Sequence, residues 1–289
     1  MVLKPPKTYQ EQVLLLKQRG CIIYDDDECV KFLKQYNYYR VSAFFLPFRN
    51  NDHSYTDDIT FLRIKSIIEF DKKIRIFIYA LIEEIELFIR TNLAYYHGHK
   101  YGPDGYLNLN NYIKSHQHTQ FIKQIDIEIE HNKNALCVMH HKQKYDGKFP
   151  IWAIIELFSL GMLSRFYADM LLDDRKKIAT DYNTKAKYLE NWLRTLTVLR
   201  NICAHHGRLY NVMFKNIPRI PPALRLKPTG KLFDQILVLI WLSPDRNIWN
   251  TQYLPYLSAL IKEYSEHIDF CHIGFCESWE SILGSIIKV

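Results

Sequence analysis

The sequence contains no glycine or proline between Phe48 and His97, and this gap constrains the fold more than any other feature. Glycine and proline interrupt helices most often, so one long helix can run through the gap without a break. Thr56, with Asp57 and Asp58 after it, predicts the start of this helix. Apolar residues then recur every three or four positions over about nine turns, as on the buried face of a helix. They are Ile64, Ile67, Phe70, Ile74, Phe77, Ile78, Leu81, Ile85 and Phe88.

Shorter helical segments surround the long one. Thr8 and Glu11 have the spacing of a capping box, at the start of a helix that Gly20 ends, and Asp25 begins the next helix. The apolar spacing predicts further helices at Phe121–Glu130, Lys231–Leu242 and Thr251–His267. No segment shows a convincing strand ladder, so the predicted fold class is all-α.

The remaining segments set the domain boundaries. Residues 131–148 hold four lysines and three histidines against one acid, which predicts an exposed loop. The apolar stretch Ile151 to Leu172 is interrupted by Gly161, which predicts either a buried helix pair or one helix bent at the glycine. We therefore expect an N-terminal helical extension at 1–50, the main helical domain at 51–267 and a weakly specified C-terminal tail at 268–289.

Length and composition limit the class of protein. A chain of 289 residues with 48% apolar residues can bury an ample core. No apolar run approaches the roughly 18 residues of a membrane span, and the N-terminus lacks the apolar core of a signal peptide, so we expect a cytoplasmic protein without membrane contact. The six cysteines are scattered. Cys271, His272 and Cys276 match no common metal site, and no metal or cofactor is predicted.

The positive charge of the chain is concentrated in one segment. The chain has 38 Lys and Arg residues and 31 Asp and Glu residues. Residues 191–233 hold eight of the basic residues and none of the acidic ones, so the rest of the chain has 30 against 31. This local field favours a polyanionic ligand, because Lys and Arg contacts to phosphates supply most non-specific nucleic-acid affinity.

The basic segment begins inside a predicted helix that starts near Tyr188. Its apolar residues have the spacing of one buried face, and Gly207 is the predicted stop signal. Arg200, His205 and His206 come at the end of this helix. The buried face is formed by Leu189, Trp192, Leu193, Leu196, Leu199 and Cys203.

The end of this helix carries a known motif. The run from Arg200 to His205, an arginine, the polar Asn201, three residues and a histidine, fits the signature of HEPN domains. In the longer form Leu-Arg-Asn-Ile-Cys-Ala-His-His-Gly-Arg-Leu-Tyr-Asn, it resembles the bacterial abortive-infection family of Abi-like proteins, of the AbiD/AbiF type. The likeness extends to blocks in the same order along the chain. They are Asn37–Ser42, Pro47–Arg49, Phe70–Arg75, Ile85–Glu86 with Arg90, and Pro150–Trp152.

The resemblance implies an α-helical HEPN bundle, usually dimeric, that cuts RNA without metal and arrests growth during phage infection. It also implies similarity to the HEPN domains of RNA-guided type VI CRISPR nucleases, and some relatives are restrained by a small structured RNA. Its catalytic residues carry over to Arg200, His205 and Asn201. The family often has tryptophan where this chain has Tyr210, which keeps an aromatic side chain.

The chemistry of these residues supports the same activity. RNA contains its own nucleophile, the 2′-OH, so an enzyme mainly has to move protons and stabilise charge on phosphorus. Histidine titrates near neutrality and suits the first task. Arginine is always charged and fork-shaped, and suits the second. We therefore predict transesterification, with His205 as acid or base, Arg200 stabilising the phosphorane and Asn201 positioning a group by hydrogen bonding.

Helix geometry separates the two main residues of the motif. Five residues turn a regular helix by about 140° net and advance it by about 7.5 Å, so Arg200 and His205 do not share a face. Either the helix distorts before Gly207, or the site is composite and forms where two copies meet across a two-fold axis. We favour His205 over His206 as the catalytic residue from the motif spacing, with His206 in a structural role.

Other residues are candidate RNA contacts. Arg40 is interleaved with aromatic residues that either stack on bases or form a packing ridge, and packing is favoured. Glu86 and Arg90 are either a surface ion pair or a pair that orients the site. The candidate RNA-binding residues are Arg194, His206, Arg208, Tyr210, Lys215, Arg219 and Arg40.

Two other functions compete with a ribonuclease. One is a non-catalytic HEPN protein that binds a small structured RNA. The other is an interaction module whose basic segment docks an acidic protein; a steep fall in RNA affinity with salt would argue against it.

Overall fold

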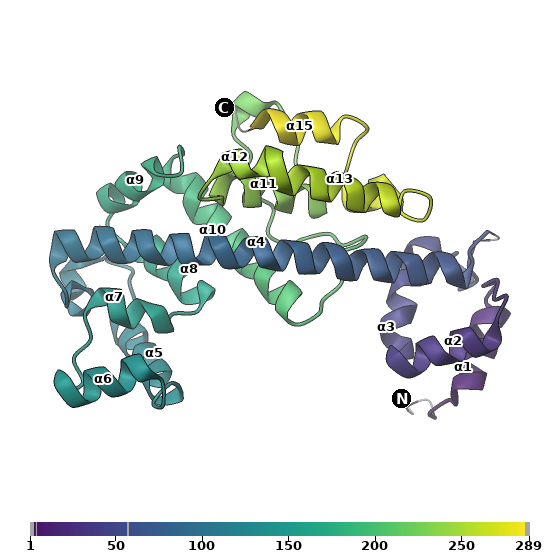
Figure 1. The fold of residues 1–289 in the computed structure, drawn as a ribbon, viewed down its shortest axis with the longest axis horizontal. Helices are drawn as coiled ribbons and strands as arrows, with labels where there is room; N and C mark the ends of the chain where they lie inside the picture. Colours follow the sequence, from purple (N-terminus) through teal and green to yellow (C-terminus); the bar gives the residue numbers. More distant parts are fainter. Residues whose placement is uncertain (1–2, 4, 57, 287–289) are drawn as a thin grey trace.

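The computed structural model describes residues 3, 5–56 and 58–286, and the chain is arranged around one long rod, α4 (Phe61–Tyr101) (Figure 1). Helix α4 has 41 residues and is therefore about 60 Å long. It crosses the width of the molecule, with the N-terminal helices at one end, α5 to α7 at the other, and α11 to α15 along one side. The long helix predicted from the sequence is confirmed.

The described residues contain no strand, only isolated bridge pairs, so the all-α fold class is confirmed. The other α-helices are α1 (Tyr9–Gln18), α2 (Asp26–Gln35), α3 (Tyr38–Ser42), α5 (His118–His131), α6 (Leu136–Lys144), α7 (Ile151–Ile154), α8 (Leu160–Asp169), α9 (Leu172–Thr180), α10 (Ala186–Ala204), α11 (Leu232–Leu242), α12 (Arg246–Ile248), α13 (Leu254–Glu263), α14 (Phe270–Ile273) and α15 (Trp279–Ser285). Short 3-10 turns lie at Ala43–Phe48, Gly105–Leu107, Leu109–Asn111, Ile155–Leu157 and Pro222–Leu224, and a π turn lies at Trp249–Tyr253.

Helix α4 starts later than the sequence indicates. Thr60 rather than Thr56 is the N-cap, and its hydroxyl accepts a hydrogen bond of 3.1 Å from the backbone N–H of Arg63. The backbone of Thr60 is extended and also forms a parallel bridge with Ile22. Asp57, which belongs to the predicted start, lies outside the described residues.

Two internal segments resolve differently from the expectation. The predicted loop at 131–148 contains helix α6, in which only Val138 is buried, so the helix lacks the apolar stripe that would reveal it. The stretch from Ile151 is a helix pair rather than one helix bent at Gly161. Ser159 separates the two helices and caps α8, accepting from the backbone N–H of Met162 at 3.3 Å.

The C-terminal segment is packed, so the prediction of a weakly specified tail is wrong for its described part. Helices α14 and α15 form there, and α15 contacts α13. Trp279 and Leu283 of α15 are buried in the same core cluster that begins at Val13 near the N-terminus. These apolar residues are too few to show a helical period in the sequence, yet they complete one side of the core.

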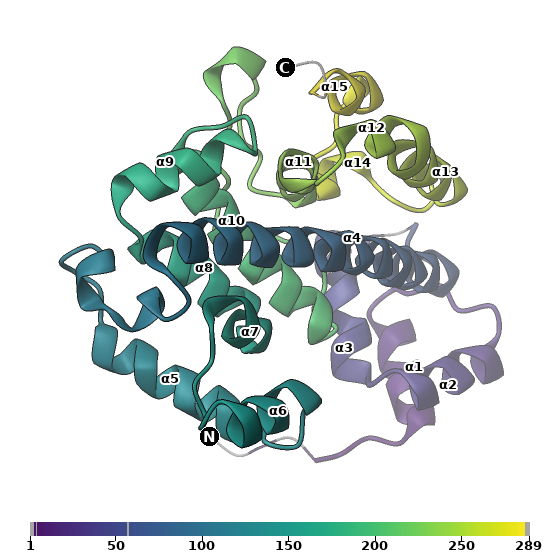
Figure 2. The ribbon, with the colours of Figure 1, turned by 60° about the vertical axis from the view of Figure 1, so that its left-hand side comes forward.

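Helix α4 is the common surface for the other layers. It packs against α7, α8 and α10, and also against α9, α11 and α13. Figure 2 shows α8 below α4 and α11 above it, with α10 crossing α4 and contacting both of the other helices. None of the described helices combines the length and the apolar content that crossing a membrane requires.

One buried histidine on α4 makes the stability of the fold depend on pH. Neither ring nitrogen of His97 has a hydrogen-bond partner among the described residues, and burial lowers the pKa of His97 from 6.5 to about 4. The unfolded chain binds this proton at higher pH than the folded chain does. We therefore expect the free energy of unfolding to fall by about 3 kcal/mol on this account as the pH drops from about 6.5 to about 4.

Denaturant unfolding of the wild type and of His97→Leu at about pH 7 and pH 4.5 tests this expectation. The wild type should lose more stability than the variant on acidification. Only in the wild type does unfolding expose a histidine ring that binds a proton, and this proton uptake favours the unfolded state at low pH. Parallel losses in the two proteins would show that His97 does not contribute.

Candidate functional site

Helix α10 presents the motif at its C-terminal end. It is a regular α-helix from Ala186 to Ala204, and every residue of the predicted apolar face is buried. The N–H of His206 donates to the carbonyl of Cys203 at 3.1 Å, and the N–H of Gly207 donates to the carbonyl of Ile202 at 2.7 Å. These two hydrogen bonds form a Schellman motif, which closes the helix at a fixed residue.

The helix stop lies one residue before the predicted glycine. His206 has a φ of 55° and occupies the left-handed position that glycine usually takes. Gly207 is needed for a different reason. A Cβ atom there would lie 2.8 Å from Cγ2 and 3.0 Å from the carbonyl oxygen of Ile202, so a side chain at Gly207 would collide with the end of the helix.

A buried carboxylate holds the backbone after the motif. One oxygen of Asp71, from α4, accepts hydrogen bonds from the backbone N–H groups of Leu209 at 2.7 Å and Tyr210 at 2.8 Å. The other oxygen pairs with the guanidinium of Arg75. Burial raises the pKa of Asp71, while the N–H donors and Arg75 act in the opposite direction. Both oxygens of the Asp71 carboxylate thus accept from donors that favour its charged form.

Two arginines tie the same turn to the rest of the fold. Arg75 also donates to the carbonyl of Gly207 at 3.2 Å. Arg40, from α3, donates to the carbonyl of His206. The turn that follows the motif is thus fastened to α4 and α3, so the position of His205 relative to the core is fixed.

Asp71 and Arg75 anchor the turn that follows the motif, and this role was not identified from the sequence. Both occur in one of the blocks that resemble the Abi-like family, but no role follows from that block alone. The sequence does contain a usable signal. Asp71 and Arg75 are four residues apart and directly follow Phe70 and Ile74 of the apolar stripe, where burial of an unpaired charge is costly.

The structure brings Arg200 and Asn201 together but keeps Arg200 apart from His205. Arg200 is half-buried and donates to Oδ1 of Asn201 at 3.3 Å. His205 is exposed and is the C-cap of α10. Within the described chain Arg200 and His205 share no hydrogen bond, as the separation of about 140° requires. Helix α10 is regular through Ala204, and the backbone leaves the helix at the C-cap His205 and at His206, whose φ is 55°.

Tyr210 belongs to the core and not to an exposed RNA surface, which corrects the expectation for this residue. Its side chain is fully buried, and burial raises the pKa of its hydroxyl to about 12. The hydroxyl is 2.9 Å from Nδ1 of His272 and accepts from the N–H of Asp269 at 3.0 Å. The side chain of Tyr210 thus fastens the motif turn to the C-terminal helices.

The other predicted RNA contacts fall into two groups. Arg40 and Arg208 are half-buried and donate to backbone carbonyls, Arg208 to that of Ala43, and burial lowers the pKa of Arg208. Their first role is therefore to join the motif turn to α3 and the turn after it. The exposed members, whose side chains are accessible to a ligand, are Arg194, His206, Lys215 and Arg219.

One cluster in the described residues has the composition of a metal site. Ligand atoms of Asp269, Cys271 and His272 lie within 4.8 Å of one another. Two of these side chains already have protein partners. Asp269 caps α14 by accepting from the N–H of Cys271 at 2.9 Å, and His272 bonds the hydroxyl of Tyr210. His272 and the backbone N–H of Asp269 therefore hold Tyr210, while the Asp269 carboxylate caps α14.

The pair of Glu86 and Arg90 is not a simple surface pair. Arg90 is buried, lies 2.8 Å from the carboxylate of Glu86 and also donates to the carbonyl of Ile155. It joins α4 to the turn after α7, away from the motif, so it contributes to the packing of that end of the molecule.

Comparison with known proteins gives one match. A family model described as Abi-like protein matches residues 31–211, from α2 through the end of the motif turn. The match includes Arg40, Asp71, Arg75 and the run from Arg200 to His205. No curated protein and no solved structure shows significant similarity to the chain.

Proposed function

The chain belongs to the Abi-like protein family, which associates it with abortive-infection defence, and on that premise we propose that it is a metal-independent endoribonuclease of the HEPN type. One observation carries the proposal. An exposed histidine, His205, stands at a helix end that Asp71 and Arg75 lock in place, with Arg200 five residues before it, inside the segment that holds the excess positive charge of the chain.

In the proposed reaction a base removes the proton from the 2′-OH of RNA and the 2′-oxygen attacks the adjacent phosphorus. The bond from phosphorus to the 5′-oxygen breaks, and that oxygen receives a proton. The products are a 2′,3′-cyclic phosphate and a 5′-OH end. His205 carries one of these protons, and Arg200 stabilises the negative charge on the phosphorane. Asn201 holds the Arg200 guanidinium through the hydrogen bond between them.

The proposal includes a homodimer. Since α10 is regular through Ala204, Arg200 and His205 of one chain point in different directions. A two-fold axis near the end of α10 would bring the motifs of two copies together, and each motif would then complete the other. RNA is the substrate, and a small structured RNA is a candidate regulator.

A second candidate is a non-catalytic RNA-binding protein. The separation of Arg200 from His205 within one chain favours it, because a site that only holds phosphates does not need the two side chains to converge. In that case the same residues would bind RNA, including a small structured RNA, without cutting it.

Cleavage of total cellular RNA by the purified protein in EDTA tests the proposal. The wild type should yield cyclic phosphate and 5′-OH ends, and Arg200→Ala should abolish them. Intact RNA with the wild type, together with unimpaired RNA binding, would contradict catalysis and favour the second candidate. Cleavage that requires added divalent metal would contradict the proposed mechanism.

A further inference from the structure

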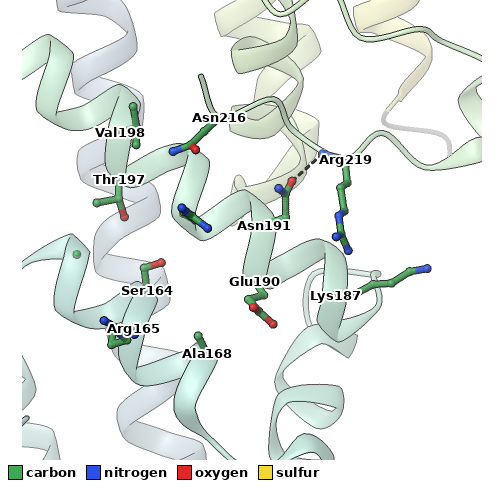
Figure 3. A pocket seen from close by; sticks show the side chains of 12 residues that line it. Ser164, Arg165, Ala168, Lys187, Glu190, Asn191, Thr197, Val198, Asn216 and Arg219 are labelled. Atoms are coloured by element: carbon green, nitrogen blue, oxygen red, sulfur yellow. Dashed lines mark hydrogen bonds between the residues drawn. The ribbon is translucent and has the colours of Figure 1, made fainter. Parts of the chain in front are cut away.

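A pocket lies on the solvent-facing side of α10, the helix that carries the motif, and its lining does not include the motif residues. It has a volume of about 680 Å³, a size typical of ligand sites. Figure 3 shows its walls, which come from α8, from α10 and from the loop after Asn211. Basic side chains line it from all three walls: Arg165 on α8, Lys187 and Arg194 on α10, and Arg219 on the loop.

The charge of this pocket is not balanced from within the protein. None of its four cations forms an ion pair in the described part of the chain. The one carboxylate of the pocket, Glu190, is engaged by Arg175 at 2.7 Å. Several cations around one pocket without counter-charges create a positive potential, which an anionic ligand would neutralise.

The loop wall of the pocket is fixed in advance. The backbone N–H of Arg219 donates to Oδ1 of Asn191 at 2.6 Å, the interaction dashed in Figure 3, and its carbonyl accepts from Nε1 of Trp192 at 2.9 Å. Trp192 is buried and stacks on Trp241, with the centroids of the two rings 4.6 Å apart. Since the loop is already held at Arg219, binding of a ligand costs less free energy for ordering this loop.

The pocket lies in line with His205 along α10. Lys187 precedes His205 by 18 residues, which is five full turns, so the two positions share one face of the helix. Arg194 and Asn201 deviate from that line by only about 20° and 40°. Arg194 lies about 16 Å from His205 along the axis. A ligand that enters the pocket and follows this face therefore reaches His205.

We infer that this pocket is a subsite for single-stranded RNA, in which Arg165, Lys187, Arg194 and Arg219 hold the phosphates of a strand whose scissile bond lies at His205. The inference rests on the proposed function and names the part of the substrate that the motif does not touch. A strand carries phosphates at both points, whereas a free nucleotide does not extend from one to the other. A concave pocket of this size suits a single strand, since duplex RNA is contacted across its wide, shallow minor groove.

The test measures binding of a fluorescent single-stranded RNA to the full chain at several salt concentrations, in a His205→Ala background that prevents cleavage. We expect Arg165→Ala and Arg219→Ala each to weaken binding by roughly five- to tenfold and to reduce the slope of log affinity against log salt by about 0.7, because each removes one phosphate contact. Lys123→Ala and Lys262→Ala remove exposed charges outside the pocket and serve as matched controls.

The outcomes separate this inference from the proposed function. Pocket variants with the affinity and salt slope of the controls would overturn the inference, even if the protein cleaves RNA. Mononucleotide that binds as tightly as RNA and is lost with Arg165→Ala would also overturn it, because the pocket would then be a nucleotide site. If the pocket variants lose RNA affinity as expected but the protein with His205 intact never cleaves, the pocket remains a single-stranded RNA site, and the scissile bond at His205 fails together with the proposed ribonuclease activity.

Discussion

Replacing His205 with alanine is expected to lower the rate of RNA cleavage by roughly 10²- to 10⁴-fold, the usual loss when a general acid or base is removed. His205 is exposed at the end of α10, and its backbone N–H bond to Asn201 remains in the variant, so the fold should not change. The measurement is kcat on a defined RNA, with the melting temperature recorded for each protein.

His206→Gly is the matched control for this experiment. His206 stands at a left-handed position, where glycine is the preferred residue, so the variant should keep the helix end and gain a little stability. We expect kcat within a few-fold of the wild type, and the loss of an RNA contact at His206 would appear in KM instead. If His206→Gly loses as much activity as His205→Ala, the assignment of the catalytic histidine from the motif spacing is wrong.

The sequence predicts the elements whose pattern is local. Helices α4 and α10 carry apolar residues at helical spacing over many turns, and both were predicted with their buried faces. Helix α6 was missed because it buries only Val138, and a helix without a stripe resembles a charged loop. The start of α4 was misplaced because the pairing of Thr60 with Ile22 is a tertiary contact, which outweighed the capping signal at Thr56.

The candidate site was only half accessible from the sequence, for the same reason. Arg200 and His205 follow from a motif of six adjacent residues. The contacts that hold them come from distant parts of the chain, since Asp71 lies 138 residues before Leu209. Tyr210 shows the opposite error. Its place in the basic segment made it a candidate RNA contact, but its hydroxyl pairs with His272, and a single sequence does not show which way a residue after a helix end will point.

Asp71→Ala is expected to destabilise the folded protein by about 3 to 5 kcal/mol, because it breaks a buried ion pair from one side. Asp71 and Arg75 are both buried, and the substitution leaves the Arg75 charge and the N–H groups of Leu209 and Tyr210 without their acceptor. RNA cleavage should fall as well, since the turn that fixes His205 loses its anchor. Denaturant unfolding and kcat on the same preparations measure the two effects.

Two further variants show whether the loss comes from the stranded charge. Asp71→Ala combined with Arg75→Met should be more stable than Asp71→Ala alone, because the double variant no longer buries an unpaired guanidinium. Asp26→Ala removes an exposed partner of Lys17, 2.7 Å away, and should cost less than about 1 kcal/mol. If Asp71→Ala costs no more than Asp26→Ala, the buried carboxylate does not hold the motif turn, and the fixed position of His205 must come from the Schellman turn and Tyr210 instead.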